Sequence, residues 1–303
     1  MTDVRRLPED FLLKMQKLLG EEYGQYLKSF KEEWKPGLRV NTWKIDPRDL
    51  AKLVPWDLEP VPWTDNGFYY DGSLEGEALR PSKHPAYYAG LYYLQEPSAM
   101  TPAAMLPVVP GDRVLDLCAA PGGKSLHLAD KLKGTGMVEA RDLSYQKTAL
   151  IEENVARFGA ANIKTVVWDA LVPDEDAMEK ADIVIADLPC SGLGIIGKKP
   201  DIKYNMTMDK MEELSRLQRE ILSVVWKYVK PGGTLVYSTC TISRMENEDN
   251  AKWLSDHFPL EPVDLSGRLG GGLDEPSLKQ GRIQFLPGIH PFDGFFISVF
   301  RRV

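Results

Sequence analysis

The three cysteines of the chain are the residues best suited to chemistry, because each follows an apolar run that predicts a buried strand. Cys190 lies in DLPCSG, Cys240 lies in YSTCT, and Cys118 begins the segment CAAPGGKS. A thiolate adds to electrophilic carbon, whereas a free thiol is only a few per cent ionised at neutral pH. We therefore predict covalent chemistry at Cys190 and Cys240. The alternative is that both are small buried apolar side chains.

Of the two, Cys240 is predicted to be the nucleophile. Ser243-Arg244-Met245-Glu246 fits a capping box, which predicts the N-terminus of a helix next to Cys240. The dipole of such a helix lowers the pKa of a neighbouring thiol. A zinc site is not expected, because the cysteines are far apart in sequence and the four histidines form no pair at ligand spacing.

A loop of small residues follows the first predicted strand of the larger part of the chain. The strand Val114–Leu117 runs into Cys118–Gly123, and a helix is predicted to follow. Small residues let backbone N–H groups and a helix N-terminus approach a ligand closely. The loop is not a P-loop, because the G-x-x-x-x-G-K-S pattern requires glycine where Cys118 stands.

Two acidic residues at the ends of the next strands point to an adenosine cofactor. Asp142 ends the second strand, where an acid takes the hydroxyls of a ribose in this architecture, and Asp169 follows the third, where it could hold the amino group of adenine. The cofactor is then a dinucleotide or S-adenosylmethionine. The G-x-G-x-x-G fingerprint is absent and Pro121 is unusual for it, so we favour S-adenosylmethionine.

From residue 111 onward, apolar runs alternate with helical stretches, which predicts a mainly parallel α/β sheet. The predicted strands are 113–117, 137–141, 164–168, 183–186 and 234–238, with two more within 281–301. The predicted helices are 123–132, 144–159, 209–229 and 244–256. Ligands bind outside the carboxyl ends of the strands of such a sheet. All three cysteines are therefore expected at its ligand-binding edge.

The first third of the chain has a different pattern. Residues 8–30 carry apolar positions at helical spacing, a strand is predicted at 38–42, and Asp46-Pro47 is predicted to begin a helix. Residues 55–85 are rich in Pro, Trp, Tyr and Gly and are expected to be irregular with short strands. We predict a small domain at 1–105 that binds substrate, followed by a catalytic domain at 106–303.

The composition is that of a soluble globular protein, with 43% hydrophobic and 27% charged residues in 303. No apolar run is long enough to span a membrane, and the N-terminus lacks the apolar core of a signal peptide, so we expect a reducing, cytoplasmic location. A net charge of −7 argues against non-specific coating of nucleic acid. Local basic patches are candidates for contact with RNA: Arg5 with Arg6; Lys198 and Lys199 with Lys203; Arg301 with Arg302.

Several of these segments together resemble one family. The chain is similar to the Sun-type RNA 5-methylcytosine methyltransferases, with an RsmF-like front half and RsmB-like catalytic motifs. The segments that carry the resemblance are 115–124, 187–192, 200–203, 238–240 and 246–248, with 38–41 and 94–100 in the front half. The resemblance implies a Rossmann-like class I methyltransferase fold with a mostly parallel seven-stranded sheet and a small α+β N-terminal domain.

The resemblance also implies a role for each catalytic residue. In this family the cysteine at position 240 attacks C6 of cytosine and makes C5 nucleophilic, and the cysteine at position 190 then assists release of the methylated base. Asp187 is expected to hold the pyrimidine edge, to favour protonation of N3 and to border the cofactor. Lys124 is expected to help orient the base. The target base must leave its stack to be attacked on its face.

The same resemblance implies how the cofactor is held. S-adenosylmethionine is expected to rest on the loop and on the first residues of the next helix, with Asp142 on its ribose and Asp169 on its adenine. The loop residues are Cys118, Ala119, Ala120, Pro121, Gly122, Gly123 and Lys124.

The expected partner is ribosomal RNA, most of all 16S rRNA or the small ribosomal subunit, and we expect a monomer without a metal. RsmF-type proteins usually carry a further RNA-binding region after the catalytic domain, whereas this sequence ends at Val303. Weak activity on naked RNA is therefore expected.

Two other classes of function compete with this interpretation. One is a catalytically silent RNA-binding or ribosome-assembly factor on the same fold, against which the intact pair of cysteines argues. The other is a methyltransferase of DNA or of a small molecule. DNA cytosine enzymes use the thiol of the Pro-Cys motif as nucleophile, so the second thiol at Cys240 favours RNA.

Overall fold

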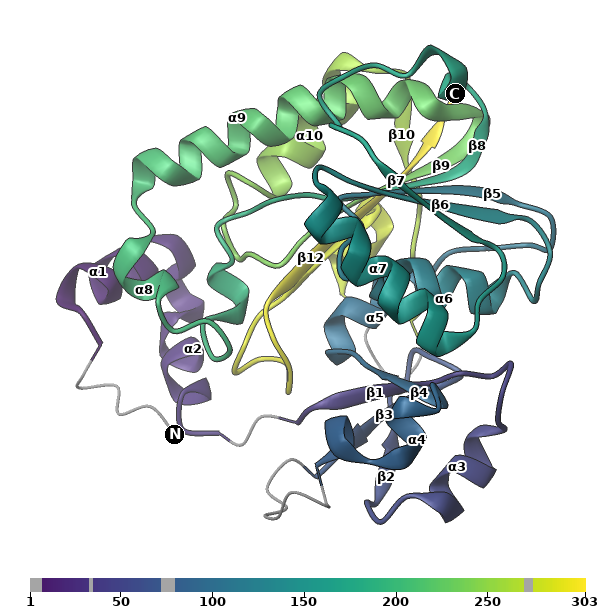
Figure 1. The fold of residues 1–303 in the computed structure, drawn as a ribbon. Helices are drawn as coiled ribbons and strands as arrows, with labels where there is room; N and C mark the ends of the chain where they lie inside the picture. The colour runs from purple at the N-terminus through teal and green to yellow at the C-terminus, as the bar shows by residue number, and fades with distance from the viewer. Residues whose placement is uncertain (1–6, 33–34, 72–79, 270–274) are drawn as a thin grey trace.

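The computed structural model describes residues 7–32, 35–71, 80–269 and 275–303 (Figure 1). Arg5 and Arg6, one of the predicted basic patches, lie outside the described residues.

The larger sheet has the strand order β10-β12-β9-β8-β5-β6-β7, and β11 pairs with β12 beside this path. In chain order the strands are β5 (Arg113–Leu117), β6 (Met137–Asp142), β7 (Ile163–Val167), β8 (Ala181–Asp187), β9 (Val229–Thr239), β10 (Leu260–Pro262), β11 (Arg282–Phe285) and β12 (Phe295–Arg302). The pairs between β9 and β7 are parallel, and every pair of β12 is antiparallel. The predicted mostly parallel seven-stranded sheet is thus present, with β11 as an eighth strand.

Helices cover both faces of this sheet. Successive residues of a strand point to opposite faces, so apolar side chains on each face pack against helices. In β8, Ile183 packs in the same core cluster as Leu126 of α6, whereas Val184 packs with Leu222 of α9. The helices concerned are α5 (Pro97–Ala104), α6 (Gly123–Lys131), α7 (Tyr145–Phe158), α9 (Met208–Val225) and α10 (Glu248–His257). Figure 1 shows α9 and α10 on one side of the sheet and α6 and α7 on the other.

A second sheet lies in the first third of the chain and has the order β2-β3-β1-β4, with every pair antiparallel. Its strands are β1 (Gly37–Val40), β2 (Leu58–Pro60), β3 (Gly67–Tyr70) and β4 (Tyr92–Leu94), and α3 (Pro47–Leu53) and α4 (Pro85–Tyr88) pack beside them. The predicted start of α3 is confirmed, because the side chain of Asp46 accepts a hydrogen bond from the backbone N–H of Arg48 at 2.9 Å.

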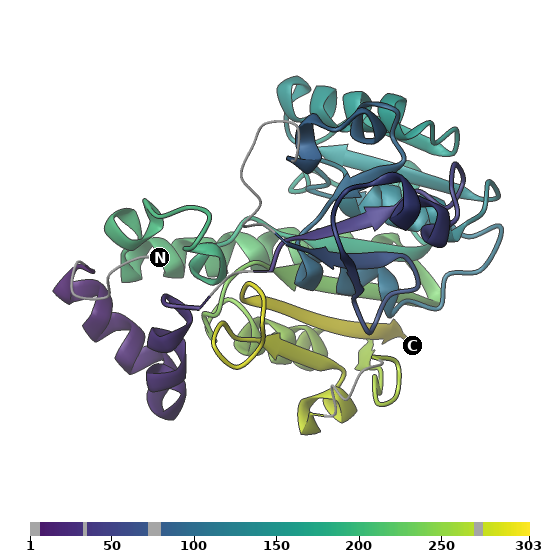
Figure 2. The ribbon, with the colours of Figure 1, turned by 90° about the horizontal axis from the view of Figure 1, so that it is seen from below.

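The first two helices, α1 (Glu9–Leu19) and α2 (Tyr23–Ser29), share a core cluster with residues of the larger, later part of the chain. Phe11 and Met15 share a core cluster with Leu193, Met211 and Leu286. In Figure 2 these purple helices lie beside the green segment that holds α8 (Ile202–Asn205). The predicted domain boundary at residue 105 stays a prediction.

Short 3-10 helices complete the chain, at Gly20–Glu22, Pro81–Lys83, Glu175–Ala177, Leu193–Ile195, Trp226–Tyr228 and Pro276–Gln280. Within the four described ranges, no helix combines the length and the apolar composition that crossing a bilayer requires.

Candidate active site

The carboxyl ends of three neighbouring parallel strands bring the predicted catalytic groups to one edge of the sheet. Cys118 follows β5, Asp187 ends β8, and Cys240 follows β9. Cys190 lies three residues beyond the end of β8. The edge is the one at which ligands bind in this architecture.

Cys190 and Cys240 face each other, with 3.3 Å between their Sγ atoms, and both are free and half-buried. Because of this contact the pKa values of the two thiols shift in opposite directions. The hydrogen bond with Cys190 lowers the pKa of Cys240, and nearby Lys124 and Lys199 also lower it, against the opposing effects of burial and of the Asp187 carboxylate. The same hydrogen bond, together with burial, raises the pKa of Cys190. Cys240 is therefore the thiol that ionises first.

The cause of this shift differs from the predicted one. The expected capping box at Ser243-Arg244-Met245-Glu246 is wrong, because α10 begins at Glu248, after a turn at 244–247, with Asn247 as its N-cap residue. The carboxylate of Glu246 instead accepts a hydrogen bond from the backbone N–H of Ser191 at 2.8 Å. The Cys190 thiol and two lysines, and not a helix dipole, favour the Cys240 thiolate.

Lys124 and Asp187 form an ion pair beside the thiols. The Nζ atom of Lys124 donates to Oδ2 of Asp187 at 2.5 Å, and the hydroxyl of Ser238 donates to the other oxygen at 2.8 Å. Burial lowers the pKa of Lys124, but the carboxylate of Asp187 more than offsets this, so the pKa is raised. Lys124 also lies over the ring of Phe295, 5.2 Å from its centroid. Lys124 therefore stays protonated, and its contacts hold both side chains in place.

The loop after β5 turns sharply and leads directly into the N-terminus of α6. Cys118 and Gly122 adopt left-handed backbone conformations, with φ of 57° and 102°, and α6 begins directly after Gly122 without a side-chain cap. Asp142, at the end of β6, accepts a hydrogen bond from the backbone N–H of Ala120 at 2.9 Å and pairs with Lys147 at 3.0 Å. Burial raises the pKa of the Cys118 thiol to about 12, so this cysteine stays protonated and is not a nucleophile.

Asp169 is less closely tied to the loop. Its carboxylate accepts a hydrogen bond from the backbone N–H of Leu171 at 3.0 Å, within a turn that follows β7. Asp169 thus lies two residues beyond the end of β7, and β7 pairs with β6, the strand that ends at Asp142.

Sequence reasoning missed Asp116, which lies within β5 and is fully buried. Its Oδ2 atom accepts a hydrogen bond from the hydroxyl of Ser125 at 2.5 Å, and burial raises its pKa to about 7. Its Oδ1 atom has no hydrogen-bond partner among the described residues. The signal available in the sequence was an acid within an otherwise apolar strand just before the small-residue loop.

These groups fit an adenosine cofactor. The uncapped start of α6 suits a carboxylate or other anionic group, Asp142 suits a pair of hydroxyls, and Asp116 leaves a buried acceptor unused. Among the described residues, no group of three or more His, Cys, Asp or Glu side chains is arranged to hold a metal ion.

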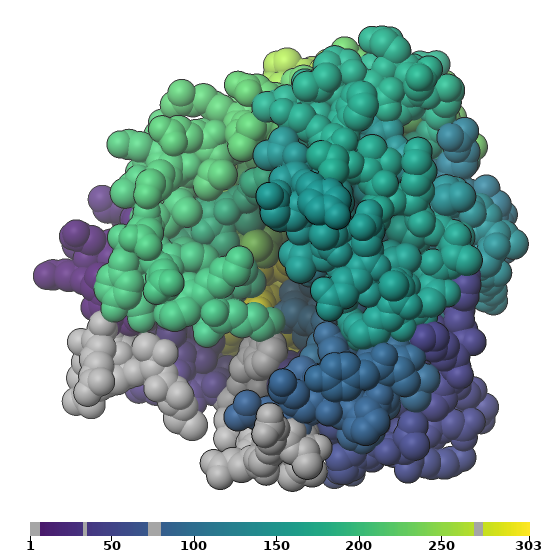
Figure 3. Space-filling view, viewed as in Figure 1, coloured from purple at the N-terminus to yellow at the C-terminus, as the bar shows by residue number. Residues whose placement is uncertain are grey.

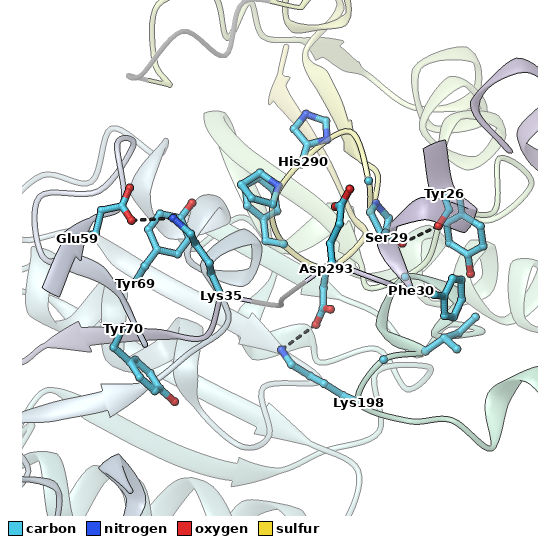
Figure 4. A pocket seen from close by; sticks show the side chains of 18 of the residues that line it. Tyr26, Ser29, Phe30, Lys35, Glu59, Tyr69, Tyr70, Lys198, His290 and Asp293 are labelled. Atoms are coloured by element: carbon cyan, nitrogen blue, oxygen red, sulfur yellow. Dashed lines mark hydrogen bonds and ion pairs between the residues drawn. The ribbon is translucent and has the colours of Figure 1, made fainter. Parts of the chain in front are cut away.

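A cavity of about 920 Å³ lies between α2, the small sheet and the segments 193–198 and 287–293, and neither Cys190 nor Cys240 is among the residues that line it. Figure 4 shows two ion pairs in it, Lys198 with Asp293 at 2.7 Å and Lys35 with Glu59 at 2.8 Å. Gly194 lines this cavity, and its backbone N–H donates a hydrogen bond to the carbonyl of Cys240 at 3.1 Å. One wall of the cavity is therefore bonded to the loop that carries Cys240. In Figure 3 the surface is hollowed between the green segment of α8 and α9 and the teal segment of α6 and α7.

The predicted basic patches have different environments. Lys198 lines the cavity, and Lys203 lies 5.1 Å from the centroid of the Tyr204 ring. Arg302 binds the fold itself, since it pairs with Glu179 and donates to the carbonyl of Val229 at 2.5 Å. Arg302 is therefore a structural residue and not a free contact for RNA.

Comparisons with known proteins agree with this geometry. A model of 16S rRNA methyltransferase RsmB/F matches residues 103–301, and a model of the N-terminal domain of 16S rRNA methyltransferase RsmF matches residues 7–97. Ribosomal RNA small subunit methyltransferase F from Escherichia fergusonii is 32% identical over 305 residues, which cover 97% of this chain and 63% of that protein. The enzyme of the same name from Escherichia coli has the same identity and coverage. This chain thus spans 63% of the length of these curated relatives.

Solved structures show the same fold. A methyltransferase homologue from Pyrococcus horikoshii superposes with a TM-score of 0.81 at 29% identity and covers 97% of this chain and 98% of that one. NSun6 from Pyrococcus horikoshii with SFG superposes with a TM-score of 0.83 at 24% identity and covers 98% of both chains. The matches confirm the predicted class I methyltransferase fold and, with it, S-adenosylmethionine as the cofactor. The chain belongs to the RsmB/F family of 16S rRNA methyltransferases.

Proposed function

We propose that this protein methylates C5 of cytosine in RNA of the small ribosomal subunit, through a covalent intermediate on Cys240. The observation that carries the proposal is the contact of 3.3 Å between Sγ of Cys190 and Sγ of Cys240, with opposite pKa shifts of the two thiols. The ion pair of Lys124 and Asp187 next to them supplies groups that bind the edge of a pyrimidine.

The first step is addition of the Cys240 thiolate to C6 of the base. The thiolate is available because Cys190, Lys124 and Lys199 lower its pKa. Addition to C6 places electron density on C5, which becomes the nucleophile. The ring must be approached from its face, so the cytosine has to be flipped out or taken from a single strand.

Lys124 and Asp187 are proposed to bind the base and to activate it for attack by Cys240. The carboxylate of Asp187 is fixed by Lys124 on one oxygen and by Ser238 on the other. Each oxygen keeps a lone pair with which it can accept a hydrogen bond from the edge of the base, and this favours a proton on N3. A positively charged ring takes up the electrons of the sulfur more readily.

S-adenosylmethionine supplies the methyl group that C5 acquires. Asp142 and the start of α6 are the residues proposed to hold the cofactor, with Asp169 at the adenine side. The backbone of the loop Cys118–Gly122 leads into the start of α6, beside the proposed cofactor site. Lys124, in the first turn of α6, connects the cofactor site to Asp187 through their ion pair.

Cys190 then assists release. The C5 proton leaves to solvent, the electron pair of its bond restores the ring double bond, and the bond between C6 and Sγ of Cys240 breaks. The thiol of Cys190 donates a hydrogen bond to the departing sulfur and so stabilises it as a thiolate. The contact that promotes attack by Cys240 thus also promotes its departure.

Substitution of each thiol tests this mechanism. The variants Cys240→Ala and Cys190→Ala are incubated with unmodified 16S rRNA or small ribosomal subunits and methyl-labelled cofactor. We expect Cys240→Ala to abolish both methylation and any covalent complex, and Cys190→Ala to accumulate a protein–RNA adduct on denaturing gels. Bisulfite sequencing of the RNA identifies the modified cytosine.

The double variant Cys190→Ala/Cys240→Ala is the control, and it should give no adduct. Adduct formation by Cys240→Ala with loss of the adduct in Cys190→Ala would reverse the two roles. Cofactor binding without methyl transfer to any ribosomal substrate would instead indicate a silent assembly factor.

A further inference from the structure

Glu246 is a fully buried carboxylate next to the two catalytic loops. Its Oε2 atom accepts hydrogen bonds from the backbone N–H of Ser191 at 2.8 Å and from Nε2 of Gln218 at 3.1 Å. Its Oε1 atom accepts a hydrogen bond from the hydroxyl of Ser191 at 2.5 Å. Both oxygens are therefore satisfied, and two of the three bonds hold the residue that directly follows Cys190.

The hydroxyl of Ser191 also contacts the loop that carries Cys240. The Oγ atom of Ser191 and the Oγ1 atom of Thr241 are 2.7 Å apart, and Thr241 directly follows Cys240. The loop that carries Cys190 and the loop that carries Cys240 are thus joined by neighbouring side chains, and Glu246 holds that junction from one side.

A buried polar frame fixes Glu246 in turn. Gln218 of α9 accepts a hydrogen bond from the hydroxyl of Tyr237 in β9 at 3.1 Å and from Nδ2 of Asn250 in α10 at 2.8 Å. The carbonyl of Glu246 lies within hydrogen-bond distance of the same hydroxyl, so the single hydrogen of Tyr237 is shared between the two acceptors. Because α9, α10 and β9 all contribute, the carboxylate cannot move without breaking several buried hydrogen bonds.

We propose that Glu246 is a positioning residue that ties the Cys190 loop to the Cys240 loop and so fixes the two thiols at contact distance. The inference deepens the proposed function, because it names what holds the thiol pair of that site together. Glu246 touches neither thiol and acts through Ser191 and Thr241.

The charge of Glu246 has a second effect. Its carboxylate contributes to the raised pKa of Cys190, after the contact with Cys240 and burial. The other charged groups around the thiol pair are Asp187 from β8, Lys124 from α6 and Lys199, which act on Cys240. Replacing Glu246 by glutamine removes the charge but keeps the shape, because an amide can accept from the Ser191 N–H and donate to its hydroxyl.

A trivalent arsenical measures the geometry of the thiol pair without RNA or cofactor. Phenylarsine oxide condenses with two neighbouring thiols to a cyclic dithioarsenite and releases one water. An excess of a monothiol does not remove it, whereas a dithiol does. Isolated Cys118 cannot form such a ring, so binding that resists the monothiol reports the Cys190–Cys240 pair alone.

We expect Glu246→Ala to weaken this binding about tenfold or more, since it removes hydrogen bonds to a charged acceptor. Glu246→Gln should retain wild-type binding. Ser191→Ala and Thr241→Val, which each remove one hydroxyl, should weaken it by a smaller factor. Glu248→Ala is the matched control and should bind as the wild type does.

Unchanged binding by Glu246→Ala, or by both hydroxyl variants if Glu246→Ala does not fold, overturns the proposal. Loss of binding in Glu246→Gln equal to that in Glu246→Ala overturns it as well, because the amide preserves the junction. The effect of the Glu246 charge is tested separately, by the pH dependence of alkylation of Cys190. Because Glu246 raises the pKa of Cys190, the profile in Glu246→Gln should shift to lower pH. An unshifted profile contradicts the role of the charge. These outcomes do not depend on RNA methylation, so a failure of the proposed function remains separable.

Discussion

At the scale of the residue, two identical thiols acquire different roles from their surroundings. The hydrogen bond between them lowers the pKa of Cys240 and raises that of Cys190. Lys124 and Lys199 add to the lowering at Cys240 against burial and Asp187, whereas burial and Glu246 add to the raising at Cys190. Sequence alone pointed to Cys240 by way of a capping box at 243–246, whereas α10 begins only at Glu248. The conclusion about its lowered pKa was correct, although the cause was wrong.

The pH dependence of alkylation tests this difference. Only the thiolate reacts with iodoacetamide, so a lowered pKa extends the reaction of Cys240 to lower pH than that of an ordinary thiol. In Cys190→Ala the hydrogen bond is lost, and the profile of Cys240 should move to higher pH. Peptide mass spectrometry separates Cys240 from Cys118. A profile that stays in place would show that Cys190 does not stabilise the thiolate.

The residues that the sequence identified at this site are those whose type is unusual for their place. A cysteine after a strand or an acid at a strand end stands out against an apolar pattern, so Cys190, Cys240 and Asp187 could be named. Glu246 could not be assigned correctly, because the same letters fit a helix cap, and its partners Ser191 and Gln218 are 55 and 28 residues away.

At the scale of the element, close contacts between backbones set the shape of the catalytic loops. Gly194 lies in the short turn at Leu193–Ile195, and a Cβ atom there would press against the carbonyls of Gly294 and Cys240. Because these neighbours are backbone, they cannot yield by rotating a side chain. The Cys240 loop is therefore held from a third side, in addition to Ser191 and Glu246.

Gly194→Ala should accordingly cost about 1–3 kcal/mol of unfolding free energy through overpacking, and methyl transfer should fall as Cys240 is displaced. Urea denaturation followed by circular dichroism measures the first effect. Gly197→Ala is the control, since a Cβ atom at that position meets nothing within 4 Å. Equal stability of the two variants would contradict the close contact at Gly194.

The strands and long helices of the larger sheet were predictable from periodicity, whereas short elements were not. The predicted strands 113–117, 137–141 and 183–186 lie close to the observed bounds of β5, β6 and β8. The three-residue strands β4 and β10 have too few residues to show a period, and tertiary pairing alone defines them.

At the scale of the whole molecule, buried polar groups join the small sheet to the methyltransferase sheet. Arg39 of β1 is fully buried, donates to the carbonyl of Gly123 at 3.4 Å and lies 3.8 Å from the carboxylate of Asp130 in α6. Asn41 donates to the carbonyl of Phe158 at 2.7 Å, and Asn66 donates to Asp130 at 2.8 Å. The small sheet therefore braces the helix that carries Lys124.

Removing Arg39 should be strongly destabilising. Arg39→Ala leaves Asp130 buried without its cation, and we expect a loss of about 3–5 kcal/mol in the free energy of unfolding. Arg48→Ala removes an exposed ion pair in the same region and should leave stability unchanged within error. Thermal and urea unfolding measure both variants. Equal stability of the two would show that this contact does not join the sheets.

The position of β12 in the sheet has a consequence for how the protein is made. This strand lies between β9 and β10, and Phe296 pairs with Thr239, the residue next to Cys240. Translation delivers β9 more than fifty residues before its neighbour, so the flank of β9 stays unpaired on the ribosome until β12 has emerged. Until then Cys240 follows a strand that is paired on one side only, with β8. A translation product that lacks β12 would expose this edge of β9, which is a template for pairing with another chain.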